Sequence, residues 1–256
     1  MLFDSHAHLD GERFDKDRDK VVERAKASGI SYIMNPGADF ESSVKAVELA
    51  SKYDMIYAAV GVHPHDTKDM DDIMLELIKG LAKKPKVMAI GEIGLDFYYD
   101  NSPRDVQKEW FRKQIRLAKN VNLPIIIHDR EANNEVMNIL KEEKAFDNGV
   151  LMHCYSGSAQ LARQYIKLGA YISIAGPLTF KNARKAVEVV KTIPIEYLMV
   201  ETDSPYLTPE PYRGKRNESS YVKYVAEKIA QIKEISFEEV AEKTTENAKK
   251  YFGISK

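Results

Sequence analysis

The sequence predicts an α/β protein of the TIM-type (β/α)8 barrel class with an extra C-terminal helix. Eight short apolar runs, most of them rich in Val, Ile, Met or Tyr, recur along the 256 residues. Charged segments with helical spacing of apolar residues lie between them, and this alternation is typical of parallel strands joined by helices. The chain shows no linker, low-complexity stretch or change in composition. We therefore expect a single barrel domain over residues 1–256.

The predicted strands are short enough to be buried on both faces, as the strands of a parallel sheet are. Eight of them, each in a strand–helix unit, favour a closed barrel over an open doubly wound sheet. In order, they are Leu2–Phe3, Ile30–Met34, Ile56–Gly61, Val87–Ile90, Pro124–Ile127, Val150–Met152, Ala170–Ile174 and Tyr197–Val200.

The predicted helices show apolar residues three or four positions apart. Their markers are Val21, Val22 and Ala25; Val44, Val47 and Ala50; Phe111, Ile115 and Ala118; Val136–Leu140; Leu161–Ile166; Ala186–Val190; and Val222–Ile232. The last helix begins at Ser236, with Glu239 in the position of a capping box, and ends near Gly253. The irregular segment Ser204–Ser220 follows the eighth strand, so we expect it to form a substrate wall at the catalytic face.

Composition limits the classes of function. The chain is 44% hydrophobic and 30% charged, which is typical of a soluble globular protein. Its 38 basic and 39 acidic residues give a net charge of −1. Without a global positive field to hold duplex nucleic acid, any contact with nucleic acid must be local.

The compartment is predicted from cysteine use and from the N-terminal residues. The single cysteine, Cys154, excludes an internal disulfide framework and fits a reducing compartment. The segment MLFDSHAHLD lacks the basic start and apolar core of a signal peptide. No apolar run approaches the roughly 20 residues of a membrane helix. We expect a cytoplasmic protein with no membrane association and no obligate protein partner.

Histidines and carboxylates are concentrated where predicted strands end. All six histidines lie there, and none falls in a predicted helix: His6, His8, His63, His65, His128 and His153. The acidic residues Glu92, Glu201 and Asp203 occupy equivalent places. Because the carboxyl ends of barrel strands surround one opening, these side chains are expected to converge.

This convergence predicts a metal site. His6 and His8 are two residues apart, so both face the same side of a strand and can chelate one ion. With Glu92, His128, His153 and Asp203, the set exceeds what one four-coordinate ion requires. Two ions become feasible if Glu92 bridges them, whereas a single ion with spare histidines is the simpler alternative.

The ions would supply the chemistry of hydrolysis. Bound water would be acidified toward hydroxide, and negative charge on the substrate would be stabilised. Asp203 could ligate an ion and also orient or deprotonate the water, so Asp203 and Glu92 are the predicted catalytic residues. Glu201 shares the inward face with Asp203, which suggests that it supports a ligand or handles a proton. No Ser-His-Asp or Cys-His arrangement competes with this interpretation, and there is no P-loop or GxGxxG after a strand.

The assembled motifs resemble those of the TatD family of metal-dependent deoxyribonucleases, within the amidohydrolase-like barrels. The resemblance runs nearly end to end and, taken together, is highly specific. Its motifs are LFDSHAHLD, GVHPH (61–65), GEIGLDFY (91–98), PIIIHDR (124–130), HCYSG (153–157), ETDSPYL (201–207), RGKRNE (213–218) and TTENAKK (244–250). Two positions depart from the family pattern: Ser219 stands where proline is usual, and Asn134 where an acidic residue is usual.

The resemblance implies the arrangement and the substrate. It implies one metal held by His6, His8, Glu92 and Asp203, and a second metal held by Glu92, His128 and His153. It further implies hydrolysis of DNA phosphodiester bonds, with single strands trimmed from their 3′ ends as a plausible mode. The residues leave the metal open, because imidazoles favour Zn²⁺ or Mn²⁺ whereas phosphodiester chemistry often uses Mg²⁺.

Several residues near the predicted ligands suit a phosphate. Protonated His63 could bind a phosphoryl oxygen or could instead orient a ligating carboxylate. Tyr155, Ser156 and Gly157 follow a ligand strand and could offer hydroxyl and backbone donors.

Basic and aromatic residues are further candidates for substrate contacts. Arg213, Lys215 and Arg216 lie in the loop after the eighth strand and could contact a short single-stranded end, although such triplets are often only solvated surface. Tyr98 and Tyr99 could stack on bases or could simply pack over the barrel rim.

Two other functions are compatible with the residues. An amide or ester hydrolase acting on a small conjugate is one, although such relatives often carry a modified lysine where this chain has Glu92. A non-catalytic protein stabilised by its ions is the other, but structural metal sites are usually closed by protein ligands.

Overall fold

The computed structural model describes residues 1–255, which divide into two compact units. Unit 1 consists of residues 1–35 and 154–256, and unit 2 of residues 36–153. All eight strands belong to one sheet, in which they follow one another in chain order from β1 to β8.

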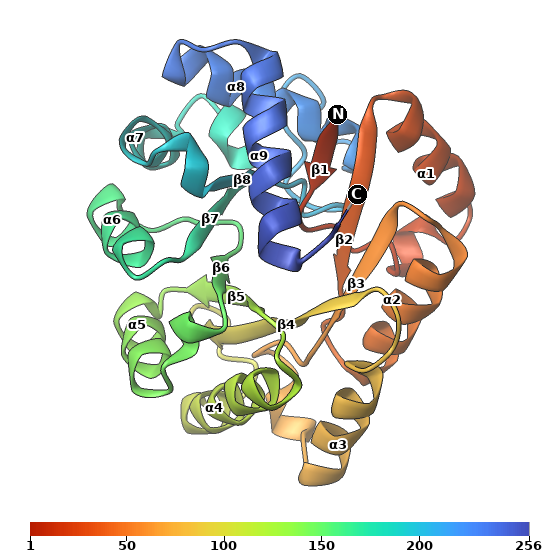
Figure 1. Cartoon of the computed structure of the whole chain (residues 1–256), viewed down its shortest axis with the longest axis vertical. Coiled ribbons are helices and arrows are strands. Elements are labelled where there is room, and N and C mark those ends of the chain that lie inside the picture. The colour runs from red at the N-terminus through yellow and green to blue at the C-terminus, as the bar shows by residue number, and fades with distance from the viewer. Residues whose placement is uncertain (256) are drawn as a thin grey trace. The chain divides into compact units, whose positions relative to one another are not determined.

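Unit 1 contains the first two and the last two strands, coloured red and blue-green in Figure 1. They are β1 (Leu2–Asp4), β2 (Ile30–Pro36), β7 (Tyr171–Ile174) and β8 (Leu198–Val200). The pairs β1–β2 and β7–β8 are parallel. The first strand also meets the last, because Ser5 N–H donates to the Val200 carbonyl at 3.0 Å and His8 N–H to the Ser204 carbonyl at 2.8 Å.

The helices of unit 1 include the predicted C-terminal one. They are α1 (Arg18–Ala27), α6 (Ala159–Lys167), α7 (Arg184–Thr192), α8 (Val222–Lys233) and α9 (Phe237–Phe252). Short 3-10 turns lie at Glu12–Phe14, Gly176–Thr179, Ile195–Tyr197 and Ser219–Tyr221.

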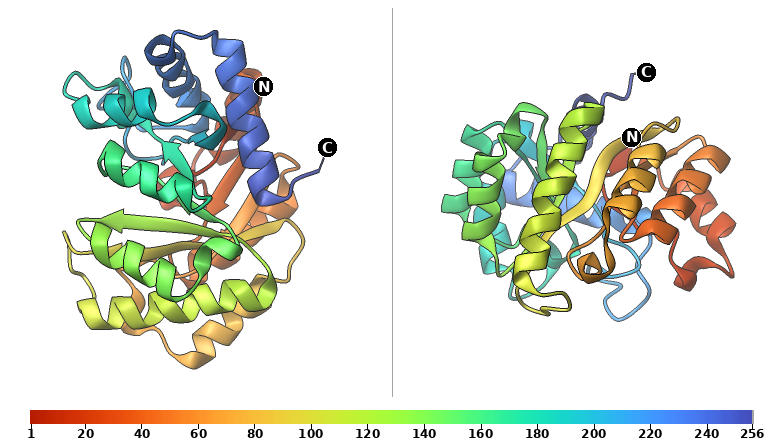
Figure 2. Two further views of the ribbon diagram at one scale, coloured as in Figure 1. Left: turned by 60° about the vertical axis from the view of Figure 1, so that its left-hand side comes forward. Right: turned by 90° about the horizontal axis from the view of Figure 1, so that it is seen from below.

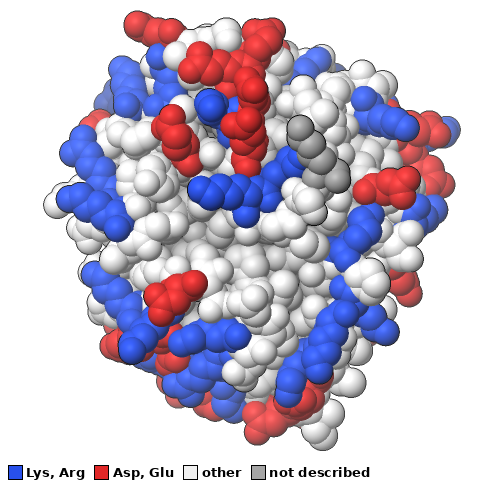
Figure 3. Space-filling model, viewed as in Figure 1, with Lys and Arg blue, Asp and Glu red and all other residues white. Residues whose placement is uncertain are grey.

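Helix α9 packs against β1, β8 and α8 and has both predicted ends. The Ser236 hydroxyl accepts from Glu239 N–H at 3.1 Å, and Gly253 ends the helix in the left-handed conformation. Figure 3 shows acidic side chains over the upper part of α9 and basic ones near its C-terminal end, which complements the helix dipole.

Unit 2 contains the four middle strands and their helices. The strands are β3 (Ile56–Val60), β4 (Val87–Asp96), β5 (Ile125–Arg130) and β6 (Val150–Met152), and their pairs β3–β4, β4–β5 and β5–β6 are parallel. The helices are α2 (Phe40–Lys52), α3 (Asp72–Leu81), α4 (Arg104–Val121) and α5 (Asn133–Glu142). Short 3-10 turns lie at Thr67–Asp69 and Ala145–Asp147. Helix α4 packs alongside β4, and α3 lies beside α4 (Figure 2).

Strand β4 is longer than predicted, and glycine explains the difference. The sequence indicated an end at Ile90, but the strand continues to Asp96. A Cβ on Gly94 would lie 1.9 Å from the His128 carbonyl oxygen, and Gly94 has φ +148°. Glycine therefore lets β4 approach β5 closely here and extends the strand.

Two helical details also differ from the sequence prediction. Helix α3 was not predicted, although its apolar residues lie on one broad face, part of which remains exposed at Ile73 and Leu77. Of the three apolar markers of helix α2, Ala50 is buried, whereas Val44 and Val47 are half-buried and Ala46 and Leu49 lie deeper.

The predicted fold class is confirmed. Eight parallel strands in chain order alternate with helices, the first strand is hydrogen-bonded to the last, and a ninth helix follows. No helix within the described residues is both long enough and apolar enough to span a membrane.

Candidate metal centre

Unit 1 brings His6, His8 and Asp203 together, and we call them the His6 cluster. The Nε2 atoms of His6 and His8 are 3.1 Å apart. Asp203 Oδ1 lies 3.9 Å from His6 Nε2 and 3.6 Å from His8 Nε2. The ligand-type atoms of the three side chains all lie within 4.8 Å of one another. Two imidazoles and one carboxylate of this kind form a three-ligand set with room for water or substrate.

The backbone that carries the His6 cluster is fixed by hydrogen bonds between its segments. Ala7 N–H donates to Met34 carbonyl at 2.9 Å, and Asp203 N–H donates to His6 carbonyl at 2.9 Å. Asp203 has φ +53°, a left-handed conformation that is uncommon for non-glycine residues and often occurs at functional sites. The chain after β8 therefore turns sharply at the residue whose carboxylate faces the two histidines.

Two buried carboxylates lie close to the His6 cluster in unit 1. Asp4 accepts from Thr202 N–H at 2.8 Å and from the Thr202 hydroxyl at 2.7 Å. Burial raises the pKa of Asp4 to about 7 against these hydrogen bonds. Glu201 is fully buried and accepts from Cys154 N–H at 2.8 Å. Glu201 thus holds the loop after β6, a role compatible with the supporting position expected for it.

Unit 2 brings three histidines around one carboxylate oxygen of Glu92. We call Glu92, His63, His128 and His153 the Glu92 cluster. His128 Nδ1 lies 2.9 Å from Glu92 Oε1, His153 Nε2 lies 3.0 Å from it, and His63 Nε2 lies 3.6 Å from it. Glu92, His63 and His153 are buried, and His128 is half-buried. The ligand-type atoms of His63, Glu92 and His128 all lie within 4.8 Å of one another. Three of the predicted metal ligands are therefore neighbours in this unit, with His63 beside them.

Asp96 was not identified from the sequence. It is fully buried next to the Glu92 cluster, on the side of His128 that faces away from Glu92. Its Oδ2 lies 3.1 Å from His128 Nε2 and 2.9 Å from His65 Nε2. Its Oδ1 accepts from the N–H groups of Tyr98 and Tyr99 at 3.0 and 2.8 Å. The signal that could have identified Asp96 is its distance of four residues from Glu92, at the end of the same strand.

The pKa values of Asp96 and His128 are shifted by the hydrogen bond between them. Burial alone would raise the pKa of Asp96, but hydrogen bonds from His128 and from Tyr99 N–H hold that pKa well below its usual range. Burial alone would lower the pKa of His128, but its hydrogen bonds to Asp96 and Glu92 raise it. His128 therefore lies between two carboxylates, with one ring nitrogen toward each.

The donor chemistry of both clusters suits divalent cations. Imidazole nitrogens with carboxylate oxygens are ligands for Zn²⁺, Mn²⁺ and related ions. In the Glu92 cluster, Asp96 approaches the far nitrogen of His128, as carboxylates behind metal-ligating histidines commonly do. On this observation the residues present fit bound metal, and His6, His8, Asp203, Glu92, His128 and His153 are the residues that would hold it.

The predicted substrate residues have different surroundings. His63 lies in the Glu92 cluster. Tyr155 is buried, and its hydroxyl donates to the Ser158 carbonyl at 2.9 Å, whereas Ser156 is exposed. The exposed Arg213 guanidinium lies 3.9 Å from the ring centroid of Phe180. Substrate contacts by these four residues stay predictions.

The predicted substrate wall, Ser204–Ser220, is an ordered loop tied to α1. Arg216 pairs with Asp17 through the two terminal nitrogens of its guanidinium group, at 2.8 and 2.7 Å. Arg24 pairs with the buried Glu218, with contacts of 2.6 and 3.0 Å. Of the basic triplet, Arg216 therefore anchors the loop, and Lys215 and Arg213 remain exposed.

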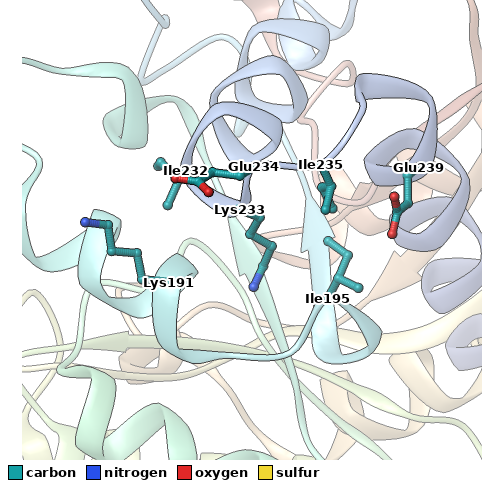
Figure 4. A pocket seen from close by; sticks show the side chains of 7 residues that line it. All are labelled: Lys191, Ile195, Ile232, Lys233, Glu234, Ile235 and Glu239. Atoms are coloured by element: carbon teal, nitrogen blue, oxygen red, sulfur yellow. The ribbon is translucent and has the colours of Figure 1, made fainter.

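A pocket of about 420 Å³ lies elsewhere in unit 1, between the ends of α7 and α8 and the start of α9 (Figure 4). Its lining is Lys191, Ile195, Ile232, Lys233, Glu234, Ile235 and Glu239. Lys233 Nζ donates to the Ile193 carbonyl at 2.6 Å, and burial lowers its pKa. Helices end at this face, opposite the carboxyl ends of the strands, so it is not the candidate centre.

Comparisons with known proteins show to which family the chain is similar. A family model described as TatD related DNase matches residues 3–253. YabD of Bacillus subtilis (strain 168), named an uncharacterized metal-dependent hydrolase, is 56% identical over 255 residues, which cover 100% of both chains. YcfH of Escherichia coli (strain K12), with the same description, is 37% identical and covers 99% of this chain and 96% of its own. The crystal structure of YJJV, a TatD homologue from Escherichia coli K12, has a TM-score of 0.94 at 29% identity, covering 99% of this chain and 98% of its own.

Proposed function

Because the chain belongs to the TatD family of metal-dependent hydrolases, we propose that this hydrolase cleaves phosphodiester bonds in DNA. The observation that carries the proposal is that each unit gathers histidines and a carboxylate at the carboxyl ends of its strands. The family model named for a DNase supports DNA as the substrate, and the net charge of −1 favours a short single-stranded end over a long duplex.

We propose two divalent cations, one held by each cluster. When bound, these cations would supply an acidified water and positive charge for the phosphoryl oxygens. His6, His8 and Asp203 would hold one, and Glu92, His128 and His153 the other. The choice among Mg²⁺, Mn²⁺ and Zn²⁺ is left to experiment.

The chain's own residues would divide the remaining work. Asp203 is half-buried, and its carboxylate faces His6 and His8, so it can accept a proton from the attacking water while it is held in place by its backbone hydrogen bond. His63 lies beside Glu92 and can donate to a non-bridging phosphoryl oxygen when it is protonated. Trimming from 3′ ends is the mode of cleavage that we propose.

The test is a comparison of substrates with purified protein. Labelled single-stranded DNA, a p-nitrophenyl phosphodiester and p-nitrophenyl acetate are incubated with Mg²⁺, Mn²⁺ or Zn²⁺ and with EDTA. We expect metal-dependent cleavage of the DNA and of the phosphodiester, with products shortened from the 3′ end. Cleavage of the acetate alone would instead indicate an amide or ester hydrolase.

Variants of the two catalytic candidates refine the test. We expect Glu92→Ala and Asp203→Ala to lose turnover by at least 100-fold while their circular dichroism spectra remain those of the folded protein. Lys113→Ala, at a half-buried lysine of α4 that pairs with Asp72, is the control and should cleave at the rate of the wild type. Wild-type activity in either carboxylate variant would remove that residue from the mechanism.

A further inference from the structure

Two adjacent tyrosines on unit 2 are exposed at the end of β4. Tyr98 is 55% exposed and Tyr99 is 54% exposed. Their rings meet edge to face, with centroids 4.9 Å apart. The Arg130 guanidinium lies 4.3 Å from the Tyr98 centroid and 4.7 Å from the Tyr99 centroid. We call Tyr98, Tyr99 and Arg130 the tyrosine platform.

The platform is held rigidly although its rings are exposed. Both tyrosine N–H groups donate to the buried Asp96 Oδ1. Arg104, at the start of α4, pairs with Asp100 and donates to the Phe97 carbonyl at 3.1 Å. Because the turn is fixed at both ends, a flat ligand could bind the rings without a large cost in ordering the chain.

The platform adjoins the Glu92 cluster through His65. The His65 ring meets Tyr99 edge to face at 5.4 Å and meets His63 at 4.3 Å. Asp96 connects the platform with these histidines. Its Oδ1 accepts from the backbone N–H of Tyr99, and its Oδ2 lies within hydrogen-bond distance of His65 and His128. A group stacked on the tyrosines would therefore lie next to the residues proposed to bind metal and phosphate.

Arg130 differs from the other arginines of unit 2. Arg104, Arg112 and Arg116 each pair with a carboxylate. Within residues 1–255, no carboxylate lies within ion-pair distance of the Arg130 guanidinium, which lies against the two tyrosine rings. An exposed cation of this kind, stacked on aromatic rings beside a metal cluster, can attract a phosphate.

We propose that the tyrosine platform binds the nucleotide next to the scissile phosphodiester. Its base stacks on Tyr98 or Tyr99, and its phosphate pairs with Arg130. Stacking of this type accepts every base, because each base has a flat π surface. The inference rests on the proposed function, which it deepens by assigning a place for the substrate's base.

The test measures binding to metal-free protein, so it does not depend on turnover. Fluorescence anisotropy compares labelled dT12 with an abasic strand of the same length. For Tyr98→Ala/Tyr99→Ala we expect binding of dT12 to weaken by about 5- to 100-fold, with little change for the abasic strand. Tyr98→Phe/Tyr99→Phe should bind dT12 as the wild type does. Ile73→Ala, at a 72%-exposed side chain of α3, is the control.

A second variant, which removes the positive charge of Arg130, tests the contact with phosphate. Arg130→Gln should weaken binding of both strands and reduce the dependence of affinity on salt by about one counterion. Wild-type affinity of the double alanine variant for dT12, or equal losses for dT12 and the abasic strand, would overturn the stacking proposal. If the platform binds bases as expected but no metal supports phosphodiester cleavage, the proposed function fails while the subsite stands.

Discussion

At the scale of single residues, Asp96 contributes most to the order of the Glu92 cluster. Its Oδ2 lies within hydrogen-bond distance of His128 Nε2, which leaves His128 Nδ1 directed toward Glu92. A carboxylate behind a metal-ligating histidine fixes the ring and the tautomer. In this way, a residue that touches neither metal nor substrate can determine how well the site binds metal.

We therefore expect Asp96→Asn to weaken metal binding by about 10- to 100-fold. The amide is close in size to the carboxylate but lacks its negative charge, so the ring of His128 is held less firmly. Competition with a chelating dye measures the affinity, and saturating metal should restore much of the activity. Asp100→Asn, at an exposed carboxylate of the same turn, is the control and should bind metal normally. Unchanged affinity in Asp96→Asn would show that the hydrogen bond is dispensable.

Alanine substitutions at two glycines of unit 2 are expected to have opposite effects on stability. Gly94→Ala places a Cβ 1.9 Å from the His128 carbonyl oxygen at φ +148°, so we expect unfolding or a loss of about 3 kcal/mol or more. Gly80→Ala lies in α3 with nothing within 4 Å of the new Cβ, so it should stabilise the protein by about 0.5–1 kcal/mol. Urea unfolding followed by circular dichroism measures both. Equal effects of the two substitutions would contradict the argument from close packing.

The predicted ligands could be named from sequence because strand alternation and strand ends determine where side chains point. The structure brings His6, His8 and Asp203 together in one unit, and Glu92, His128 and His153 together in the other. Asp96 was not named, although it lies four residues from Glu92 on the same strand, because its importance depends on the position of the His128 ring. That position follows from the approach of β4 to β5 at Gly94, which no local pattern reveals.

At the scale of elements, the loop after β8 depends on α1. The pair Arg216–Asp17 ties the two together, and hydrogen bonds from Arg216 lower the pKa of Asp17 to about 2. A carboxyl group with a lowered pKa stabilises the fold above its ordinary value near 3.8, and this contribution is lost as the pH falls toward 2.

We expect Arg216→Ala to lower the melting temperature by about 1–3 °C at pH 7. The difference from the wild type should shrink between about pH 4 and pH 2, because Asp17 is then protonated in both proteins. Calorimetry over this range gives the result. Lys215→Ala, at an exposed neighbour, should melt as the wild type does at every pH. A pH-independent difference would mean that Arg216 acts through its hydrogen bond to the Arg13 carbonyl and its packing on Phe14 rather than through Asp17.

Most elements could be predicted because their apolar spacing is regular, as in α1, α4 and α9. Helix α3 was missed although its apolar residues also lie on one broad face, on which Ile73 and Leu77 remain exposed to solvent. The buried face of α2 also includes Ser43, whose hydrogen bonds with Gly61 cannot be inferred from hydrophobic spacing. Burial of polar groups depends on partners far along the chain.

At the scale of the whole molecule, metal binding should appear as stability. A ligand that binds only the folded state stabilises it by about 2.7 kcal/mol at 100 times its dissociation constant. For a chain of this size that corresponds to a rise in melting temperature of roughly 5–10 °C. We expect at least one of Mg²⁺, Mn²⁺ and Zn²⁺ to produce this rise and EDTA to reverse it. No change with any of these ions would contradict the assignment of both clusters.

The composition of unit 1 has a consequence for biosynthesis. It joins residues 1–35 to residues 154–256, and Ser5 and His8 are hydrogen-bonded to Val200 and Ser204. During translation, His6 and His8 therefore leave the ribosome long before Asp203, which is translated almost two hundred codons later. The residues of unit 2 are contiguous and can assemble meanwhile, so the Glu92 cluster is the first metal site that the nascent polypeptide can complete.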